Sequence, residues 1–312
     1  MPAIRNVTIL GAGALGSLYG SRFYQAEHIQ VHFLARGARY ERLKAEGILV
    51  NGQCYKIPVQ HPDDDLPPAD LILVALKNHH LPAAAPDLAA VVGDQTIILS
   101  VMNGIDSEED LGAIYGMEKL LYCIAVGMDA VREGGQVTYQ NPGKLIFGEE
   151  TNDEISPRVR RVQAAFEAAA IPYETPVDMI RILWWKFMVN VGMNQTSAAM
   201  RAPYGVFHTS PDAQALMEAS MQEVIALAEC VGVDLTEGDI ADWYPFLHGL
   251  SPEGKTSMLQ DIEAGRKTEI ELFAQKVVDL GEKHAVPTPV NETLLRIIRV
   301  LERGALAARY ES

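Results

Sequence analysis

The start of the chain constrains its fold most, because an apolar segment over residues 5–10 runs directly into a glycine-rich stretch. That stretch consists of Gly11, Ala12, Gly13, Ala14, Leu15 and Gly16. In a strand-turn-helix unit the first glycine permits a tight turn, the second lets phosphates approach the backbone, and the third lets the helix pack on the strand. The phosphates then lie at the helix N-terminus. These six residues are predicted to bind a dinucleotide; a glycine-rich turn without a ligand is the alternative.

The end of the second strand, about 20 residues after the glycines, should decide which dinucleotide binds. This strand is predicted over residues 30–35, and Arg36 follows it. Proteins that bind NAD usually carry an acidic residue here, whereas an arginine suits the 2′-phosphate of NADP(H). Arg39 and Arg42 extend the basic patch. We therefore expect NADP(H) as the cofactor; surface arginines at the start of a helix are the alternative.

Length and charge narrow the class of protein. The chain has 312 residues, 48% of them hydrophobic, which accommodates two modest domains. The net charge of −15 disfavours nucleic acid or an anionic membrane as a partner. Neither a cationic leader nor an apolar run of about 18 residues is present, so a cytoplasmic protein is expected.

The three cysteines, Cys54, Cys123 and Cys230, lack metal-site spacing. They are expected to be buried thiols, with no metal bound.

Alternating short apolar strands and helical segments over residues 5–175 predict a Rossmann-type, doubly wound α/β domain. A helix over 157–170 is expected to close it. Strands are expected at 70–76 and 96–101 and, as a hairpin around Asn141-Pro142-Gly143 that ends the sheet antiparallel, at 136–139 and 144–148.

Beyond Asp178 the strand patterns stop, and helical periodicity predicts an all-α domain. Its helices are expected at 181–200, 212–231, 254–284 and 291–309. The expected organisation is thus an NADP(H)-binding domain over residues 1–175 and a helical substrate-binding, catalytic domain over 176–312.

Two predicted strands of the sheet end in polar residues. Lys77 follows the strand at 70–76, and Asn103 with Gly104 follows the strand at 96–101. Ligands bind outside the carboxyl ends of parallel strands. Lys77 is therefore a candidate for the phosphate or adenosine side of the cofactor, and Asn103 for the nicotinamide or the substrate. A solvated lysine and an Asn-Gly turn are the alternatives.

Lys186, Asn190 and Asn194 are spaced four residues apart in an otherwise apolar helical segment, so they share one face. An unpaired buried polar group costs on the order of several kcal/mol, which a substrate cleft would relieve. Burial also lowers a lysine pKa, so Lys186 is the predicted proton donor to the alkoxide that hydride addition creates. An interhelical hydrogen-bond network, with the lysine reaching solvent, is the alternative. His79 and His80 lack a neighbouring carboxylate and are weaker candidates.

A second polar cluster contains Ser257 and Glu269. A serine hydroxyl donates to a carboxylate and accepts from a hydroxyl, which fits a 2-oxo or 2-hydroxy acid. The two residues lie roughly 120° apart on an ideal helix, so they face one site only if Gly265 bends it. A capping serine and a solvated glutamate are the alternatives.

With these motifs the chain resembles the ketopantoate reductase (2-dehydropantoate 2-reductase) family over nearly its whole length. The matching elements are the glycine run, Leu76-Lys77, Asn103-Gly104, Leu183-Trp184-Trp185-Lys186 with Asn190 and Asn194, Ser257 to Ile262, and Thr268-Glu269-Ile270. The resemblance implies that Lys186 is the general acid. It further implies substrate contacts from Asn103, Asn190, Asn194 and Ser257, a 2′-phosphate contact from Arg36, and cofactor contacts or support of the lysine from Lys77, Asn103 and Glu269.

The implied reaction is the NADPH-dependent reduction of 2-dehydropantoate to (R)-pantoate, a step toward pantothenate and coenzyme A. Gly254, Met102, Gln195 and Tyr204 depart from the family pattern. A reductase of another 2-oxo acid is therefore the second hypothesis, and a non-catalytic NADP(H)-binding sensor the third. The apolar faces of the helices leave a homodimer possible.

Overall fold

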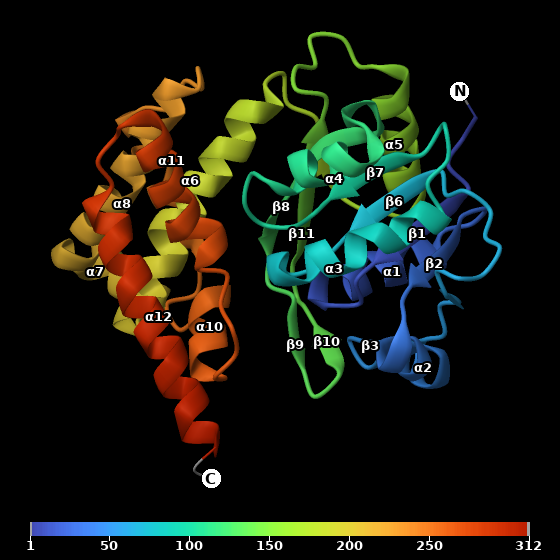
Figure 1. The fold of residues 1–312 in the computed structure, drawn as a ribbon, viewed down its shortest axis with the longest axis horizontal. Coiled ribbons are helices and arrows are strands. Elements are labelled where there is room, and N and C mark those ends of the chain that lie inside the picture. The colour runs from blue at the N-terminus through green and yellow to red at the C-terminus, as the bar shows by residue number, and fades with distance from the viewer. Residues whose placement is uncertain (1, 311–312) are drawn as a thin grey trace. The chain divides into compact units, whose positions relative to one another are not determined.

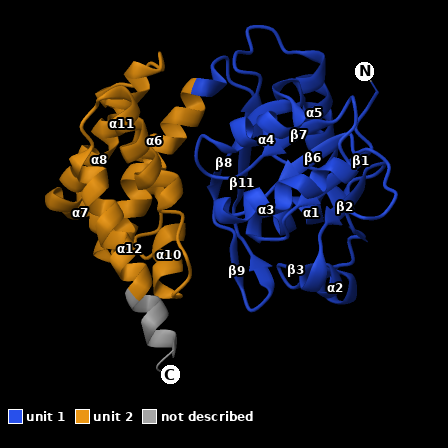
Figure 2. Ribbon diagram, viewed as in Figure 1, with its two compact units in different colours: residues 1–180 blue, residues 181–312 orange. Residues whose placement is uncertain are grey.

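The structure, a computed structural model, describes residues 2–310 and divides into two compact units, residues 1–180 and 181–312 (Figure 2). The first is a Rossmann-type α/β unit and the second is helical (Figure 1), which confirms the predicted fold class. The assignment of cofactor binding to residues 1–175 and of catalysis to 176–312 stays a prediction. None of the helices described is long and apolar enough to span a membrane.

The α/β unit is built on an eight-stranded sheet in the order β12-β11-β8-β7-β6-β1-β2-β5. Every neighbouring pair is parallel except β8 with β11. The strands are β1 (Asn6–Leu10), β2 (Gln30–Leu34), β5 (Val59–Gln60), β6 (Leu71–Val74), β7 (Ile97–Ser100), β8 (Leu120–Met128), β11 (Pro142–Gly148) and β12 (Tyr173–Glu174).

Both faces of the sheet are buried. In β6, Leu71 and Leu73 join one hydrophobic core, whereas Ile72 and Val74 join the other, as the two-residue period of a strand requires. Helices and 3₁₀ turns cover the two faces, which is why the central strands read as continuous apolar runs. They are α1 (Ala14–Gln25), α2 (Gly37–Glu46), η1 (Asn78–His80), α3 (Leu81–Ala84), η2 (Ala85–Ala90), α4 (Ser107–Tyr115), η3 (Met117–Lys119) and α5 (Pro157–Ala168).

A smaller sheet in this unit corrects the predicted hairpin. Its order is β4-β3-β10-β9, with β3 (Ile48–Val50), β4 (Gln53–Tyr55), β9 (Val131–Glu133) and β10 (Gln136–Thr138). The predicted pairing of 136–139 with 144–148 is wrong: β10 pairs with β9 and β3, and β11 pairs with β8. Gly134 and Gly135, at φ 54° and 90°, form the turn between β9 and β10. Two adjacent glycines with positive φ suit a two-residue hairpin better than Asn141-Pro142-Gly143 does.

The second unit is a set of helices connected by short loops. They are α6 (Met179–Met200), α7 (Tyr204–Thr209), α8 (Pro211–Cys230), α9 (Glu237–Gly249), α10 (Ser257–Glu263), the π-helical turn η4 (Glu271–Gln275), α11 (Lys276–His284) and α12 (Pro289–Tyr310). The prediction of one helix over 254–284 is wrong. Gly265, at φ 59°, follows α10 and separates it from η4 and α11. The sequence analysis also missed α7 and α9.

A buried carboxylate joins three helices of this unit. Glu223 on α8 accepts hydrogen bonds from the backbone N–H groups of Val290 (2.7 Å) and Asn291 (3.0 Å) at the start of α12. It also accepts from Asn291 Nδ2 (2.6 Å), and Asn291 Oδ1 accepts from Gln195 Nε2 on α6 (3.0 Å). A negative charge at a helix N-terminus is stabilising, so Glu223 fixes the start of α12.

The cysteines differ from expectation in their exposure. Cys123 on β8 is buried as predicted, but Cys54 and Cys230 are exposed. Cys54 lies on the edge strand of the small sheet, and Cys230 is the last residue of α8. Neither position faces a core.

Candidate functional site

The turn between β1 and α1 has the backbone geometry that a pyrophosphate requires. Gly11 has φ 108°, and a side chain there would overlap the carbonyl oxygen of Ala75. A side chain at Gly16 would overlap the carbonyl oxygen of Gly11. At Gly13, by contrast, the nearest atom to an added β-carbon is Ala75 O at 3.9 Å. Neighbouring protein atoms therefore leave no room for a side chain at positions 11 and 16, while the space beside Gly13 is open for a ligand.

The N-terminus of α1 also fits an anion. Gly13 is the N-cap residue, no side chain forms a capping hydrogen bond, and the first turn has no acidic residue. The first helical amides are thus available, and the helix dipole favours a negative group beside them. A dinucleotide pyrophosphate fits this combination of open space and unused donors.

Arg36 is the N-cap residue of α2 and makes two ion pairs. Its guanidinium donates to Asp87 Oδ1 (2.6 Å) and contacts both carboxylate oxygens of Asp63 (2.8 and 2.9 Å). The hydrogen bonds to Asp63 and Asp87 raise the Arg36 pKa. Because one guanidinium lies between two carboxylates, this group of three carries a net negative charge.

Lys77 and Asn103 lie at the carboxyl ends of neighbouring strands, as predicted from the sequence. Lys77 comes just after β6 and is the N-cap residue of η1, and Asn103 comes just after β7. Both side chains are half-buried. Since β6 and β7 pair in parallel, the two residues lie at one edge of the sheet.

A buried polar network, which the sequence analysis missed, supports the segment that carries Asn103. Ser100 Oγ accepts from the backbone N–H of Met102 (3.3 Å) and lies 2.7 Å from Ser107 Oγ. Ser107 Oγ lies 2.8 Å from a carboxylate oxygen of Glu108, which is 1% exposed. Burial raises the pKa of Glu108 to about 7. A Ser-Glu pair at the start of a helix was the available signal.

In the helical unit, three of the predicted substrate-binding residues form one hydrogen-bonded chain. Asn190 and Asn194 on α6 are 5% and 9% exposed. Asn194 Nδ2 donates to Asn190 Oδ1 (3.1 Å), and Ser257 Oγ at the start of α10 donates to Asn194 Oδ1 (3.3 Å). The polar network between helices is therefore present, and it includes an exposed hydroxyl at Ser257.

Lys186 lies one turn before Asn190 on α6 and is half-buried. Burial lowers its pKa to about 8. Within the part of the chain whose side chains the structure describes, no residue forms a hydrogen bond or an ion pair with the Lys186 side chain. A partly desolvated ammonium with unused donors is suited to donate a proton to a ligand.

Thr256, a residue not singled out from the sequence, fixes α10. It is the N-cap of α10, where its hydroxyl accepts from the backbone N–H of Leu259 (3.2 Å). Thr256 Oγ1 also contacts Ser197 Oγ on α6 (3.1 Å), and Ser197 Oγ donates to Ala202 O (2.7 Å). Because Thr256 caps the helix, the hydroxyl of Ser257 is left to interact with Asn194 and a ligand.

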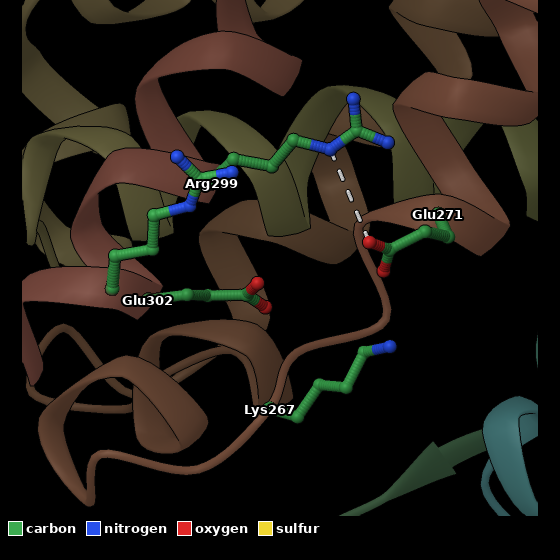
Figure 3. A pocket seen from close by; sticks show the side chains of 5 residues that line it. Lys267, Glu271, Arg299 and Glu302 are labelled. Carbon is green, nitrogen blue, oxygen red and sulfur yellow. Dashed lines mark ion pairs between the residues drawn. The ribbon is translucent and has the colours of Figure 1, made fainter. Parts of the chain in front are cut away.

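Glu269 lies between α10 and η4, in a loop that is attached to α12. Its neighbour Thr268 donates from both the backbone N–H (2.7 Å) and the hydroxyl (2.5 Å) to Glu302 Oε1. Beside this loop is a pocket of about 300 Å³ that contains an ion pair between Arg299 and Glu271 (Figure 3). The pocket is lined by Lys267, Glu271, Arg299, Glu302 and Arg303.

Comparison with known proteins gives a consistent result over both units. The family described as Ketopantoate reductase PanE/ApbA matches residues 7–152, and its C-terminal part, described as Ketopantoate reductase PanE/ApbA C terminal, matches residues 178–302. The 2-dehydropantoate 2-reductase of Archaeoglobus fulgidus is 29% identical over 305 residues, which cover 96% of this chain and 99% of that protein.

Solved structures agree. The 2-dehydropantoate 2-reductase from Geobacter metallireducens GS-15 has a TM-score of 0.83 and 28% identity, covering 94% of this chain and 99% of that one. D-mandelate dehydrogenase with NADH and anilino(oxo)acetate has a TM-score of 0.85 and covers 96% of this chain and 99% of that one. Its identity is 21%, so this likeness concerns the fold alone.

Proposed function

Because the chain belongs to the ketopantoate reductase family, and is thus an oxidoreductase of a nicotinamide-dependent kind, we propose that it reduces 2-dehydropantoate to (R)-pantoate with NADPH. The observation that carries this proposal is the half-buried Lys186 ammonium, one helical turn from the chain Asn190, Asn194, Ser257. A proton donor and a set of polar groups for a hydroxy acid thus occur together on α6 and α10.

The proposed mechanism assigns a step to each of these groups. NADPH, when bound, would supply the hydride for the ketone carbon of the substrate. Lys186, whose pKa is about 8, carries a proton at neutral pH, polarises the ketone oxygen and protonates it as negative charge develops. Asn194 and Ser257 bind the substrate's carboxylate and hydroxyl groups, and Asn190 orients Asn194 through their hydrogen bond.

The cofactor-binding residues are proposed from the first unit. Gly11 to Gly16 would hold the pyrophosphate at the start of α1, and Arg36 would contact the 2′ position of the adenosine ribose. Lys77 and Asn103 contribute from the carboxyl ends of β6 and β7, with Asn103 also facing the substrate. Glu269 is proposed to contact the cofactor or to support Lys186.

A second candidate function, reduction of a different 2-oxo acid, is favoured by the surroundings of Gly254. A β-carbon at this position would lie 3.0 Å from Cδ2 of Tyr204 and 2.9 Å from Ser251 O. The space that a larger residue would fill is thus taken by the Tyr204 ring. Both residues depart from the family pattern, which favours a substrate whose side chain differs from that of ketopantoate.

The test is the loss of absorbance at 340 nm with NADPH or NADH and a panel of 2-oxo acids. Ketopantoate should exceed every other acid in kcat/KM by more than about tenfold. A better result with another acid supports the second candidate. Full activity of Lys186→Ala on every acid would contradict the assigned proton donor, and no turnover with any acid despite NADPH binding would favour the sensor.

A homodimer and a cytoplasmic location stay predictions. Light scattering on the purified protein decides whether it is a homodimer.

A further inference from the structure

The positive charge near the second strand is distributed differently from what the sequence suggested. Arg36 is engaged by Asp63 and Asp87, and the three side chains together carry one net negative charge. A phosphate monoester brings further negative charge, so it is repelled by this group as a whole. Arg36 offers directed N–H donors once one carboxylate turns away, but it supplies no surplus positive charge.

The surplus lies one and two helical turns further along α2. Arg39 and Arg42 follow Arg36 at intervals of three residues, which places them along one side of the helix. Arg39 is exposed and Arg42 half-buried. Neither forms an ion pair or a hydrogen bond with any residue of the described part of the chain. In a chain with a net charge of −15, these two neighbouring guanidinium groups thus form a local concentration of positive charge.

A third arginine joins them from a distant segment. Arg132 on β9 lies opposite Val137 on β10, which pairs with Val50 on β3, the strand that follows α2. Arg132 likewise forms no ion pair with any side chain that the structure describes. Partial burial and then the charges of Arg42 and Arg39 lower its pKa. The three guanidinium groups are thus close enough to repel one another, which costs free energy in the absence of an anion.

Arg39 connects this cluster to the cofactor side of the sheet. His80 in η1 has its pKa lowered by burial and then by the charges of Arg39 and Lys77. Both His80 and Lys77 follow β6, the strand beside β1 and its glycine turn. Arg39 therefore lies close enough to His80, as Lys77 does, for its charge to act on that ring. The acidic residues of α2 form no ion pair with Arg39 or Arg42. Lys44 on the same helix donates a hydrogen bond to the Tyr40 hydroxyl, and this bond and then the charge of Glu41 raise the Lys44 pKa.

The geometry points to Arg39, Arg42 and Arg132 as a basic subsite that supplies the net positive charge for the ribose phosphate of NADP(H), with Arg36 contributing donor direction only. This inference rests on the proposed use of NADP(H). It predicts that recognition of the 2′-phosphate depends on a residue of β9, more than eighty positions away from the second strand in the sequence. Coulombic attraction of this kind weakens with ionic strength.

The test measures ligand binding without catalysis. Isothermal titration calorimetry compares 2′,5′-ADP with 5′-ADP on the wild-type chain and on the variants Arg39→Gln, Arg132→Gln and Arg39→Lys. The matched control is Lys44→Gln, which removes one positive charge from another face of the same helix. In the wild type, 2′,5′-ADP should bind at least about tenfold more tightly than 5′-ADP, as an ion-paired phosphate monoester implies.

We expect Arg39→Gln and Arg132→Gln each to reduce this preference about fivefold, with 5′-ADP affinity changed less than about twofold. Arg39→Lys should keep most of the preference, which separates loss of charge from loss of fold, and Lys44→Gln should keep all of it. The inference is overturned if both glutamine variants keep the wild-type preference, or if Lys44→Gln lowers it equally. If the wild type binds 2′,5′-ADP no more tightly than 5′-ADP, the use of NADP(H) is refuted, and the subsite with it. Turnover of ketopantoate with NADH would in that case leave the assignment as a reductase intact.

Discussion

Tyr204 and Gly254 form one structural unit. The backbone N–H of Tyr204 donates to Gly254 O (3.0 Å), and the tyrosine ring occupies the space that a side chain at position 254 would enter. Partial burial raises the Tyr204 pKa, in keeping with a ring packed against protein. The packing at these two positions is therefore coupled.

Gly254→Ala should lower the free energy of unfolding by about 1–3 kcal/mol, because the added carbon crowds the ring. In a Tyr204→Ala background the same substitution should cost at least about 0.5 kcal/mol less, since the ring is absent and only the contact with Ser251 O, 2.9 Å from the added carbon, remains. Urea unfolding of the four chains measures this coupling. Additive costs in the double variant would show that the two residues act independently.

Lys186→Met should abolish activity yet stabilise the fold. Replacing a half-buried ammonium by an apolar chain of similar length removes a desolvation cost, and at pH 7 a gain of about 1–3 kcal/mol is expected. The native lysine pKa, about 8, lies below its unfolded value, so the wild-type free energy of unfolding should rise between about pH 8 and pH 10. Urea unfolding across this range should show the rise in the wild type and its absence in the variant.

The titration of Lys186 should also appear in the pH dependence of kcat. If Lys186 gives the proton, kcat with a good substrate should fall as the pH rises through about 8, because the ammonium is lost. A kcat that is constant from pH 6 to 10, or a Lys186→Met variant that keeps more than about 10% of it, would assign the proton to another group.

Asp63→Asn should increase the preference for NADPH. The change frees Arg36 from one of its two carboxylates and removes one negative charge from an exposed position. Because exposed ion pairs contribute only about 0–1 kcal/mol, a two- to fivefold decrease of the NADPH KM is expected, with the NADH KM unchanged. Asp65→Asn, at an exposed position nearby, is the control. An NADPH KM that rises in Asp63→Asn would contradict the repulsion argued above.

Glu223→Ala should destabilise the helical unit by about 2–4 kcal/mol. The substitution leaves two backbone N–H groups and the Asn291 amide at the start of α12 without their acceptor. Glu292→Ala, which removes an exposed carboxylate paired with Arg296 on α12, should cost less than about 0.5 kcal/mol. Equal shifts of the urea midpoint in the two variants would show that the Glu223 hydrogen bonds stabilise the fold no more than the exposed Glu292–Arg296 ion pair does.

The sequence predicted what depends on local pattern. The glycine turn, the strands around 70–76 and 96–101 and the helices near 181–200, 212–231 and 291–309 all follow from short-range periodicity, and they occur within a few residues of the expected bounds. The spacing of Asn190 and Asn194 likewise places them on one face because a helix repeats every 3.6 residues.

What the sequence could not predict depends on distant residues. The Arg36 ion pairs join segments 27 and 51 positions apart, so no local pattern contains them. The break after α10 was missed because Gly265 is tolerated within a helix, and only its φ of 59° shows that the helix ends. Helix α9 contains Pro245, and a proline in a helix interior removes a hydrogen bond, so local preference does not favour this helix, which is nevertheless present.

The two adjacent hydroxyls at the start of α10 have a mechanical consequence. Thr256 binds Ser197 while Ser257 binds Asn194, so α10 is attached to α6 at two points along its axis and resists both sliding and rotation. Gly254 and Tyr204 lie just outside this double attachment. A change at Gly254 or Tyr204 can thus alter the packing of this corner while the two hydroxyls keep their register on α6, which separates the packing of the loop before α10 from the position of the polar chain.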